Sequence, residues 1–98
     1  MCLFRTDFEF YYDEDTMDLP EAVLDSAMLS AEAKNVYVYI IYLITEGVDH
    51  IVSAMRTIPE VSDHVNQGMQ ELLACGLLRR DETASQEAYI VTKEFYQH

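Results

Sequence analysis

The chain has 98 residues, half of them apolar, and its 18 acidic residues against 6 basic ones give a formal net charge of −12. This length is enough for one hydrophobic core and too short for two, so we expect a single domain over residues 1–98. The apolar content argues against disorder, and no apolar run approaches the roughly 20 residues that span a bilayer. The N-terminus lacks the three regions of a signal peptide, so a cytoplasmic protein is expected.

The net charge bears on the class of partner. A strongly acidic surface repels the phosphate backbone of nucleic acids and attracts basic protein surfaces. The plainer interpretation is that the acidity only keeps a small protein soluble. Residues 1–30 alone hold eight acidic side chains against Arg5, which favours the first interpretation.

An alternating segment near the N-terminus predicts a strand. Residues 7–12 alternate charged or polar with aromatic side chains, and Phe4 and Thr6 continue the same phase. Period-two alternation with aromatic residues is typical of a half-buried strand. The aromatic side, which is also a candidate for self-association, comprises Phe8, Phe10 and Tyr12.

The acidic segment that follows, residues 13–18, has the composition of a calcium loop but not its pattern. An EF-hand loop beginning at Asp13 needs glycine at its sixth position and glutamate at its twelfth, where the chain has Asp18 and Leu24. The cysteines and histidines share no metal-binding spacing. A phosphate-binding glycine loop and a nucleophile–base set are also missing from the sequence. We therefore expect no metal, no other cofactor and no catalysis.

Two helices are predicted between residues 19 and 47. Pro20 and Glu21 suit the start of a short helix, where a missing donor is harmless and negative charge is favourable. Ser30 suits the N-cap of a longer helix over residues 31–46, which Gly47 closes. One face of the longer helix has the apolar spacing of a core face. Its other side is apolar too, and either the N-terminal segment covers it, which we favour, or a second copy does; the exposed candidates are Val38, Tyr39 and Tyr42.

The second half of the chain predicts two more helices. Ser53 suits the N-cap of a short helix over residues 54–58, and Ser62 that of a helix over residues 63–75, which stops at Gly76. The inner face of the second of these helices has apolar side chains at helical spacing: Val65, Met69, Leu72 and Leu73. His64 is expected at the exposed start of that helix, and Cys75 is expected as a buried thiol rather than a reactive one.

Residues 77–80 and 88–92 predict two strands joined by a polar turn over residues 81–87. The predicted fold class is therefore α+β, mainly α. The order of a helix, a short helix, a tight turn, a helix and a hairpin is that of a winged helix-turn-helix.

The stretch "LSAEAKNVYVYIIYL", followed by "VSDHVNQGMQELLACGLLRR", resembles the N-terminal winged helix domains of DnaD-like primosome proteins and of plasmid and phage replication initiators. In those families a Leu-Ser opens the first helix, an Ala-Lys follows, and a Gly-Leu-hydrophobic step leads into the wing. The matching residues are Leu29, Ser30, Ala33, Lys34, Gly76, Leu77 and Leu78. The resemblance covers residues 19–92 and implies a winged helix core over residues 29–92, with residues 1–28 as an N-terminal strand and short-helix extension.

The predicted recognition helix contains no lysine or arginine, although phosphate contacts supply much of the affinity of DNA-binding proteins. This favours a non-enzymatic protein that binds a basic, nucleic-acid-handling partner, as an inhibitor of the DNA-mimic type or as an adaptor. Small acidic inhibitors encoded by phages, including DNA mimics directed at restriction or CRISPR nucleases, are similar in size and charge. The candidate partner-binding residues are Asp13, Glu14, Asp15, Asp18, Asp63, Gln67, Gln70, Glu71, Asp81, Glu82 and Glu87.

Two alternatives stay open. Asn and Gln side chains on the same helix can read adenine edges, so a dimeric DnaD-like module for replication initiation or transcription, binding DNA directly, is the second interpretation. The third is a subunit of a larger assembly that buries the apolar side of the first long helix against another chain.

Overall fold

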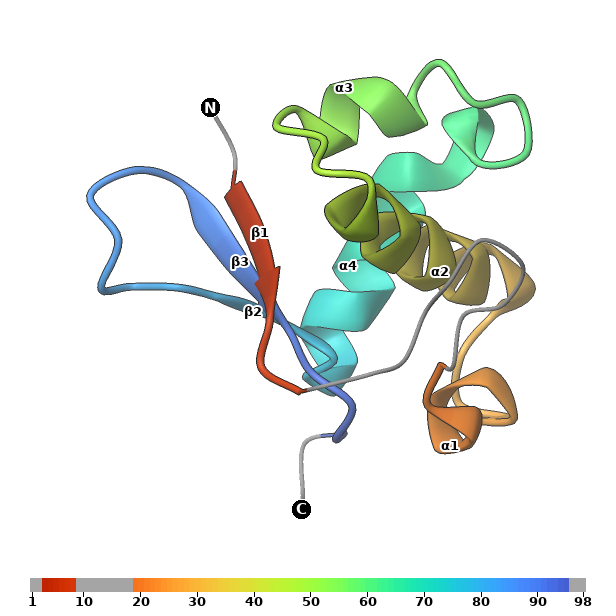
Figure 1. The fold of residues 1–98 in the computed structure, drawn as a ribbon. Helices are drawn as coiled ribbons and strands as arrows, with labels where there is room; N and C mark the ends of the chain where they lie inside the picture. Colours follow the sequence, from red (N-terminus) through yellow and green to blue (C-terminus); the bar gives the residue numbers. More distant parts are fainter. Residues whose placement is uncertain (1–2, 9–18, 96–98) are drawn as a thin grey trace.

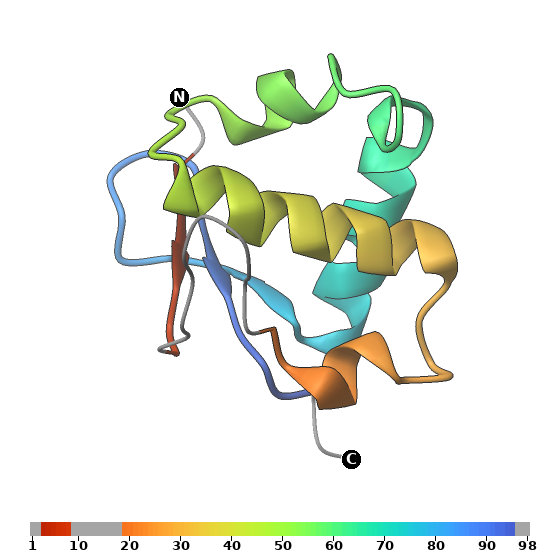
Figure 2. The ribbon, with the colours of Figure 1, turned by 45° about the vertical axis from the view of Figure 1, so that its right-hand side comes forward.

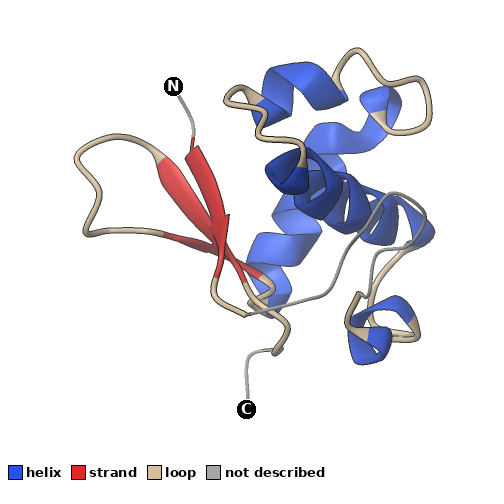
Figure 3. Cartoon of the chain, in the orientation of Figure 1, coloured by secondary structure: helices blue, strands red, loops and turns tan. Residues whose placement is uncertain are grey.

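The structure is a computed structural model, and it describes residues 3–8 and 19–95. These residues contain five helical segments and three strands. The domain is of the α+β class and mostly helical, with the sheet on one side of the helices (Figures 1 and 3). In chain order the elements are β1 (Leu3–Thr6), α1 (Glu21–Leu24), α2 (Ala31–Thr45), α3 (Ile51–Met55), η1 (a 3-10 turn, Ser62–His64), α4 (Val65–Cys75), β2 (Leu78–Arg80) and β3 (Ala88–Val91). In this part of the chain, every helix is too short or too polar to cross a membrane.

The two ends of the α2–α4 region follow the capping signals of the sequence. The Ser30 hydroxyl accepts a hydrogen bond from the Ala33 N–H at 3.1 Å, which confirms Ser30 as the N-cap of α2. At the other end, α4 stops at Gly76, whose φ of 90° lies in the left-handed region that glycine adopts without strain. Helix α2 ends at Thr45 with Glu46 as its C-cap, one residue earlier than predicted.

Helices α2 and α4 cross at close range because a glycine lies at the contact. A Cβ atom on Gly68 would lie 2.8 Å from Cβ of Val36 and 3.3 Å from the Glu32 carbonyl oxygen, so no larger residue fits without movement. Val65 and Leu72 of α4 are buried, as predicted, and Met69 and Leu73 are partly buried against the same core. The largest fully buried side chains are Tyr37, Ile40, Ile41, Met55, Leu72, Leu77 and Leu78.

The sheet has the strand order β1-β3-β2 and mixes both directions. β2 and β3 form the predicted antiparallel hairpin, whereas β1 pairs with β3 in parallel, from Leu3 opposite Ala88 to Thr6 opposite Val91. The ring of Phe4 stacks on that of Tyr89, with 5.2 Å between the centroids. The two ends of the chain therefore meet in one sheet (Figure 2).

Three predicted elements differ in the structure. The N-terminal strand lies at Leu3–Thr6, earlier than residues 7–12; the ladder continues only as the Asp7 N–H bond to the Val91 carbonyl, and residues 9–12 lie outside the described part. Helix α3 begins at Ile51, because Ile51 and Met55, four residues apart, both enter the core, and Ser53 lies inside the helix without capping it.

The start of α4 also differs from the prediction. Ser62 opens the 3-10 turn η1 and gives no side-chain cap, and the α-helix proper begins at Val65. His64 was expected to be exposed, but it is only partly so, and its Nε2 atom is buried without a hydrogen-bond partner among the described residues.

Candidate partner interface

The outward face of α4 is polar and holds few charges. Its side chains follow the helical period from η1 onwards, and the exposed ones are Asp63, Asn66, Gln67, Gln70 and Ala74. Asn66 accepts a hydrogen bond from Arg56, at the end of α3, over 3.3 Å. Of the predicted partner-binding residues on this helix, Asp63, Gln67 and Gln70 are thus displayed to solvent, and they offer one carboxylate and two amides.

Glu71 serves the fold. Its Oε2 atom accepts a hydrogen bond from the Ser30 hydroxyl at 2.6 Å, and its Oε1 atom accepts a longer one from the Ser30 N–H at 3.4 Å. The side chain is half-buried, whereas the sequence places it on the outward face. Glu71 therefore ties the start of α2 to α4, and less of its charge is open to a partner.

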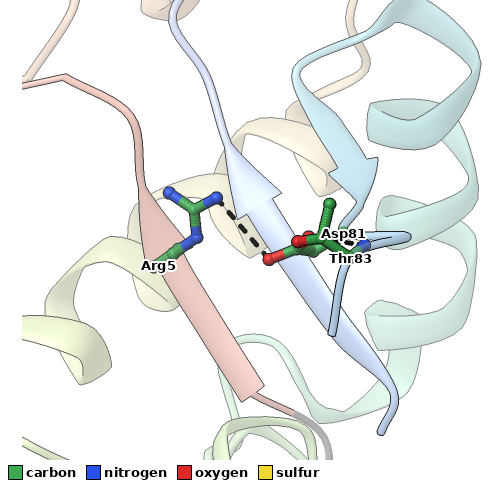
Figure 4. A network of polar contacts seen from close by, with 3 residues as sticks. All are labelled: Arg5, Asp81 and Thr83. Carbon is green, nitrogen blue, oxygen red and sulfur yellow. Dashed lines mark hydrogen bonds and ion pairs between the residues drawn. The ribbon is translucent and has the colours of Figure 1, made fainter. Parts of the chain in front are cut away.

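The turn of the hairpin begins with a carboxylate that is held on both sides. Asp81 Oδ1 accepts hydrogen bonds from the Thr83 N–H at 3.1 Å and from its hydroxyl at 2.6 Å, and Oδ2 lies 3.5 Å from Nη2 of Arg5 (Figure 4). These hydrogen bonds, chiefly those from Thr83, and the nearby guanidinium lower the pKa of Asp81. The carboxylate is therefore ionised and fixed in direction.

The other two acidic residues of the hairpin turn are exposed. Glu87 Oε1 accepts a hydrogen bond from the Tyr89 hydroxyl at 2.8 Å, so this carboxylate too is oriented by the sheet. For Glu82, the described residues provide no hydrogen bond or ion pair, and its charge faces solvent. The remaining candidates, Asp13, Glu14, Asp15 and Asp18, lie outside the described residues.

Most of the basic residues lie in the sheet or next to it. Arg5 and Arg79 both pair with Ile90 and so share the outer face, while Arg80, the next residue, points to the opposite side. Arg79 Nε also donates to the Gly76 carbonyl at 3.0 Å. With Lys93 just after β3, four of the 6 basic residues lie on or beside the sheet. α4 itself has none, so these charges do not line its outward face.

The apolar candidates for self-association are only partly open. Tyr42 is 43% exposed and meets Tyr39 edge to face, with 6.5 Å between the ring centroids. Tyr39 and Val38 are half-buried, and Phe8 packs partly buried against the core. Phe10 and Tyr12 lie outside the described residues, so the predicted cover over this side of α2 stays a prediction.

A pocket beside β1 is a feature that the sequence did not reveal. It has a volume of about 270 Å³ and lies between β1, β3 and the hairpin turn. Its lining is mainly apolar, with the Arg5–Asp81 ion pair at its side: Leu3, Phe4, Arg5, Asp81, Ala84, Ala88 and Tyr89. These residues come from both ends of the chain, and only the parallel pairing of β1 with β3 brings them together.

Within residues 3–8 and 19–95, no group of three or more metal-ligating side chains lies close enough to hold an ion. Burial raises the pKa of the half-buried Cys75 thiol, which favours its neutral form, and the thiol lies within 3.5 Å of the Leu72 carbonyl oxygen. Cys75 is thus less buried than the sequence predicts.

Comparison with known proteins gives no relative: no family model, no curated protein and no solved structure matches the chain. The arguments for function below therefore start from the described surfaces.

Proposed function

We propose that the chain is a non-enzymatic interaction protein, a winged helix scaffold that binds the basic surface of a nucleic-acid-handling protein. In this interpretation α2, α3 and α4 are the helical core, α4 takes the place of the recognition helix, and the β2–β3 hairpin is the wing. The order of these elements supports it, as does the hairpin that follows α4 after two residues, Gly76 and Leu77.

The observation that carries the proposal is the chemistry of the two surfaces that a winged helix protein brings to DNA. Asp63 of η1 lies among the amides that the outward face of α4 displays, and the hairpin turn displays Glu82 and Glu87. A duplex binder needs several phosphate contacts from lysine or arginine. Next to these surfaces lie Arg56, which bonds to Asn66, and Arg80 at the end of β2, which are too few for several phosphate contacts. Carboxylates in the same places form charge-assisted hydrogen bonds with arginine and lysine side chains that otherwise hold phosphates.

One fixed and exposed carboxylate makes such recognition more favourable. Glu87 is oriented by the Tyr89 hydroxyl, so little side-chain entropy is lost when a partner binds it. The Asp81 carboxylate is engaged by Thr83 and Arg5 and its side chain is only 14% exposed, so it is less open to a partner. A mimic of phosphate groups works better when its charges already have fixed directions.

A capture experiment with charge-reversal variants tests the proposal. The protein is immobilised, incubated with host extract, and compared with the double variant Asp63→Lys/Glu82→Lys. This variant reverses the charge of two side chains whose carboxylates are exposed to solvent. We expect the variant to lose the basic partners that the parent retains. The double variant Glu46→Lys/Asp49→Lys has the same net charge, with the changes at exposed positions after α2, and it should retain them.

A measurement of direct DNA binding is the second test of the proposal. Fluorescence anisotropy with a labelled duplex at low salt, where electrostatic attraction is strongest, should give no saturable complex at micromolar protein. A micromolar or tighter complex would contradict the proposal and favour the second candidate.

That second candidate is a dimeric DNA-binding module of the DnaD-like kind. It is supported by the exposed aromatic side of α2, where Tyr42 and Tyr39 pack edge to face at the surface. A dimer through this side would also combine the basic residues of two chains. Light scattering on the eluted protein, together with Tyr42→Asp, separates this candidate from the first, because only a dimer through α2 loses mass in the variant.

A further inference from the structure

We infer that β1 is a docking edge, at which an extended segment of the partner, with a basic residue beside an apolar one, adds a fourth strand to the sheet. This rests on the proposed function, since it names how a basic partner would be held. Three features of β1 support the inference: its outward N–H and C=O groups, the pocket beside it and the charges near it.

The edge follows from the register of the sheet. Leu3 donates its N–H to the Glu87 carbonyl at 3.0 Å and Asp7 donates its own to the Val91 carbonyl at 3.1 Å, so the odd-numbered residues of β1 face β3. The N–H and C=O groups of Phe4 and Thr6 consequently point away from β3. The strand order places β1 at the edge, and among the described residues no strand lies on its other side. Such groups are a template for an added strand.

The pocket provides a place for a side chain of that strand. Neighbouring strands lie about 4.8 Å apart, so a residue opposite Leu3 on the outer face of the sheet is within reach of the pocket beside it. Leu3 is 37% exposed, and the pocket of about 270 Å³ is walled by the small side chains Ala84 and Ala88. A side chain of the size of valine or leucine fits this volume, and main-chain bonds with a specific pocket are how strand addition achieves affinity and selectivity.

The charges around β1 favour a docking segment with positive charge. Glu87, whose carbonyl oxygen accepts the Leu3 N–H, is exposed at the beginning of β1. Asp7 is exposed at the end of β1, where it and Glu94 line a pocket together with Arg79 and Lys93, so the charges at that end are balanced. The only basic residue of β1, Arg5, is already paired with Asp81. A segment with lysine or arginine beside an apolar residue therefore meets an unbalanced carboxylate at the Glu87 end of the strand. A second copy of this chain would bring another formal charge of −12 to the same edge, which opposes that occupant.

The test uses the full chain labelled with nitrogen-15 and two blocked peptides, Lys-Val-Lys-Val-Lys and Glu-Val-Glu-Val-Glu. With the basic peptide we expect hydrogen exchange of the Phe4 and Thr6 amides to slow by about tenfold, which is the order of one added hydrogen bond. The acidic peptide should leave both amides unchanged. A basic peptide methylated on its alternate backbone nitrogens should also fail, because it cannot donate to the edge.

Two substitutions check the surface from the side of the protein. Thr6→Pro removes an outward N–H that does not bond to β3, and Ala84→Leu fills the pocket. Each substitution should weaken binding of the basic peptide by about tenfold. Ala31→Leu, at an exposed position of α2, is the matched control and should have no effect. Retained protection of the Asp7 amide shows that the sheet of each variant is intact.

Each other outcome contradicts the inference in a recognisable way. Basic-peptide binding that shifts only α4 resonances overturns the docking edge and leaves the proposed function standing. Equal binding of the acidic peptide overturns the charge argument. Protection of Phe4 and Thr6 without peptide, with a doubled mass, identifies a second copy as the occupant. Absence of binding by either peptide at millimolar concentration also overturns the inference, and the proposed function is then judged by its own capture experiment.

Discussion

The α2–α4 helix pair and the sheet are held together in different ways. The helix pair depends on close apolar packing, where Gly68 meets Val36, and its outward face has few attachments. The sheet is bound by polar contacts, among them the Tyr37 hydroxyl bond to the Thr92 carbonyl and the Arg5–Asp81 ion pair. The comparison teaches that the sheet fixes the directions of the carboxylates of the hairpin turn, whereas the polar side chains on the outward face of α4 have few such contacts.

The largest effect is expected at the packed contact. Gly68→Ala should lower the free energy of unfolding by about 2–3 kcal/mol, because the added Cβ overlaps the Val36 side chain. Alanine normally favours a helix over glycine, so a loss here is diagnostic of the close crossing. Urea unfolding followed by circular dichroism gives the value. The double variant Gly68→Ala/Val36→Ala should recover part of the loss, and a single variant as stable as the parent would contradict the packing argument.

The next effect concerns the polar tie between α2 and the end of β3. Tyr37→Phe removes the buried hydroxyl that donates to the Thr92 carbonyl at 2.8 Å and should cost about 1–2 kcal/mol. Burial raises the pKa of this tyrosine, so in the parent no ultraviolet signal of phenolate is expected from Tyr37 until the protein unfolds in alkali. Tyr39→Phe is the control, and an equal loss there would remove the special role of the buried bond.

A smaller effect is expected at the cap that joins the helices. Ser30→Ala removes the acceptor of the Ala33 N–H and the donor to Glu71, and it should cost about 1 kcal/mol. A double-mutant cycle with Glu71→Gln isolates the contact between the two side chains. If the two single changes simply add, Glu71 does not support the cap, and its carboxylate becomes a candidate for partner binding again.

The smallest effect is a dependence on pH. The lowered pKa of Asp81 means that its ionised form stabilises the fold above the ordinary aspartate pKa of about 3.9, and that this contribution is lost as the pH falls through the lowered value. Asp81→Asn should therefore be less stable than the parent at neutral pH and equal to it in strong acid. Glu82→Gln, which removes a charge without removing a contact, should show no such convergence. Equal curves for both variants would mean that only net charge matters.

Much of the helical part could be predicted from the sequence because its signals are local. Ser30 and Gly76 sit at the helix ends that their capping and left-handed preferences predict, and the buried positions of α4 follow the helical period. The predicted start of α3 is wrong because two local signals compete. Ser53 can cap a helix, but burial of the apolar pair Ile51 and Met55 in the core starts the helix at Ile51.

The parts that could not be predicted depend on residues far apart in the chain. Alternation indicates a strand near the N-terminus, but it says neither where that strand ends nor that β3 is its partner. Likewise, the helical period places Glu71 on an outward face, and only the fold brings it to Ser30, 41 residues away. The pocket beside β1 has no sequence signal for the same reason, since Leu3 and Ala88 line it together.

The parallel pairing of β1 with β3 also governs how the protein is made. During synthesis the residues of β1 leave the ribosome long before residues 88–91, so Phe4 has no Tyr89 to stack on until β3 has been made. The contacts between α2 and α4 can form earlier, whereas the core that both helices share with Tyr89 and Val91 is complete only after β3 is made. Completion of the sheet therefore follows the emergence of β3, and a chain arrested before that point leaves Phe4 without the ring on which it stacks.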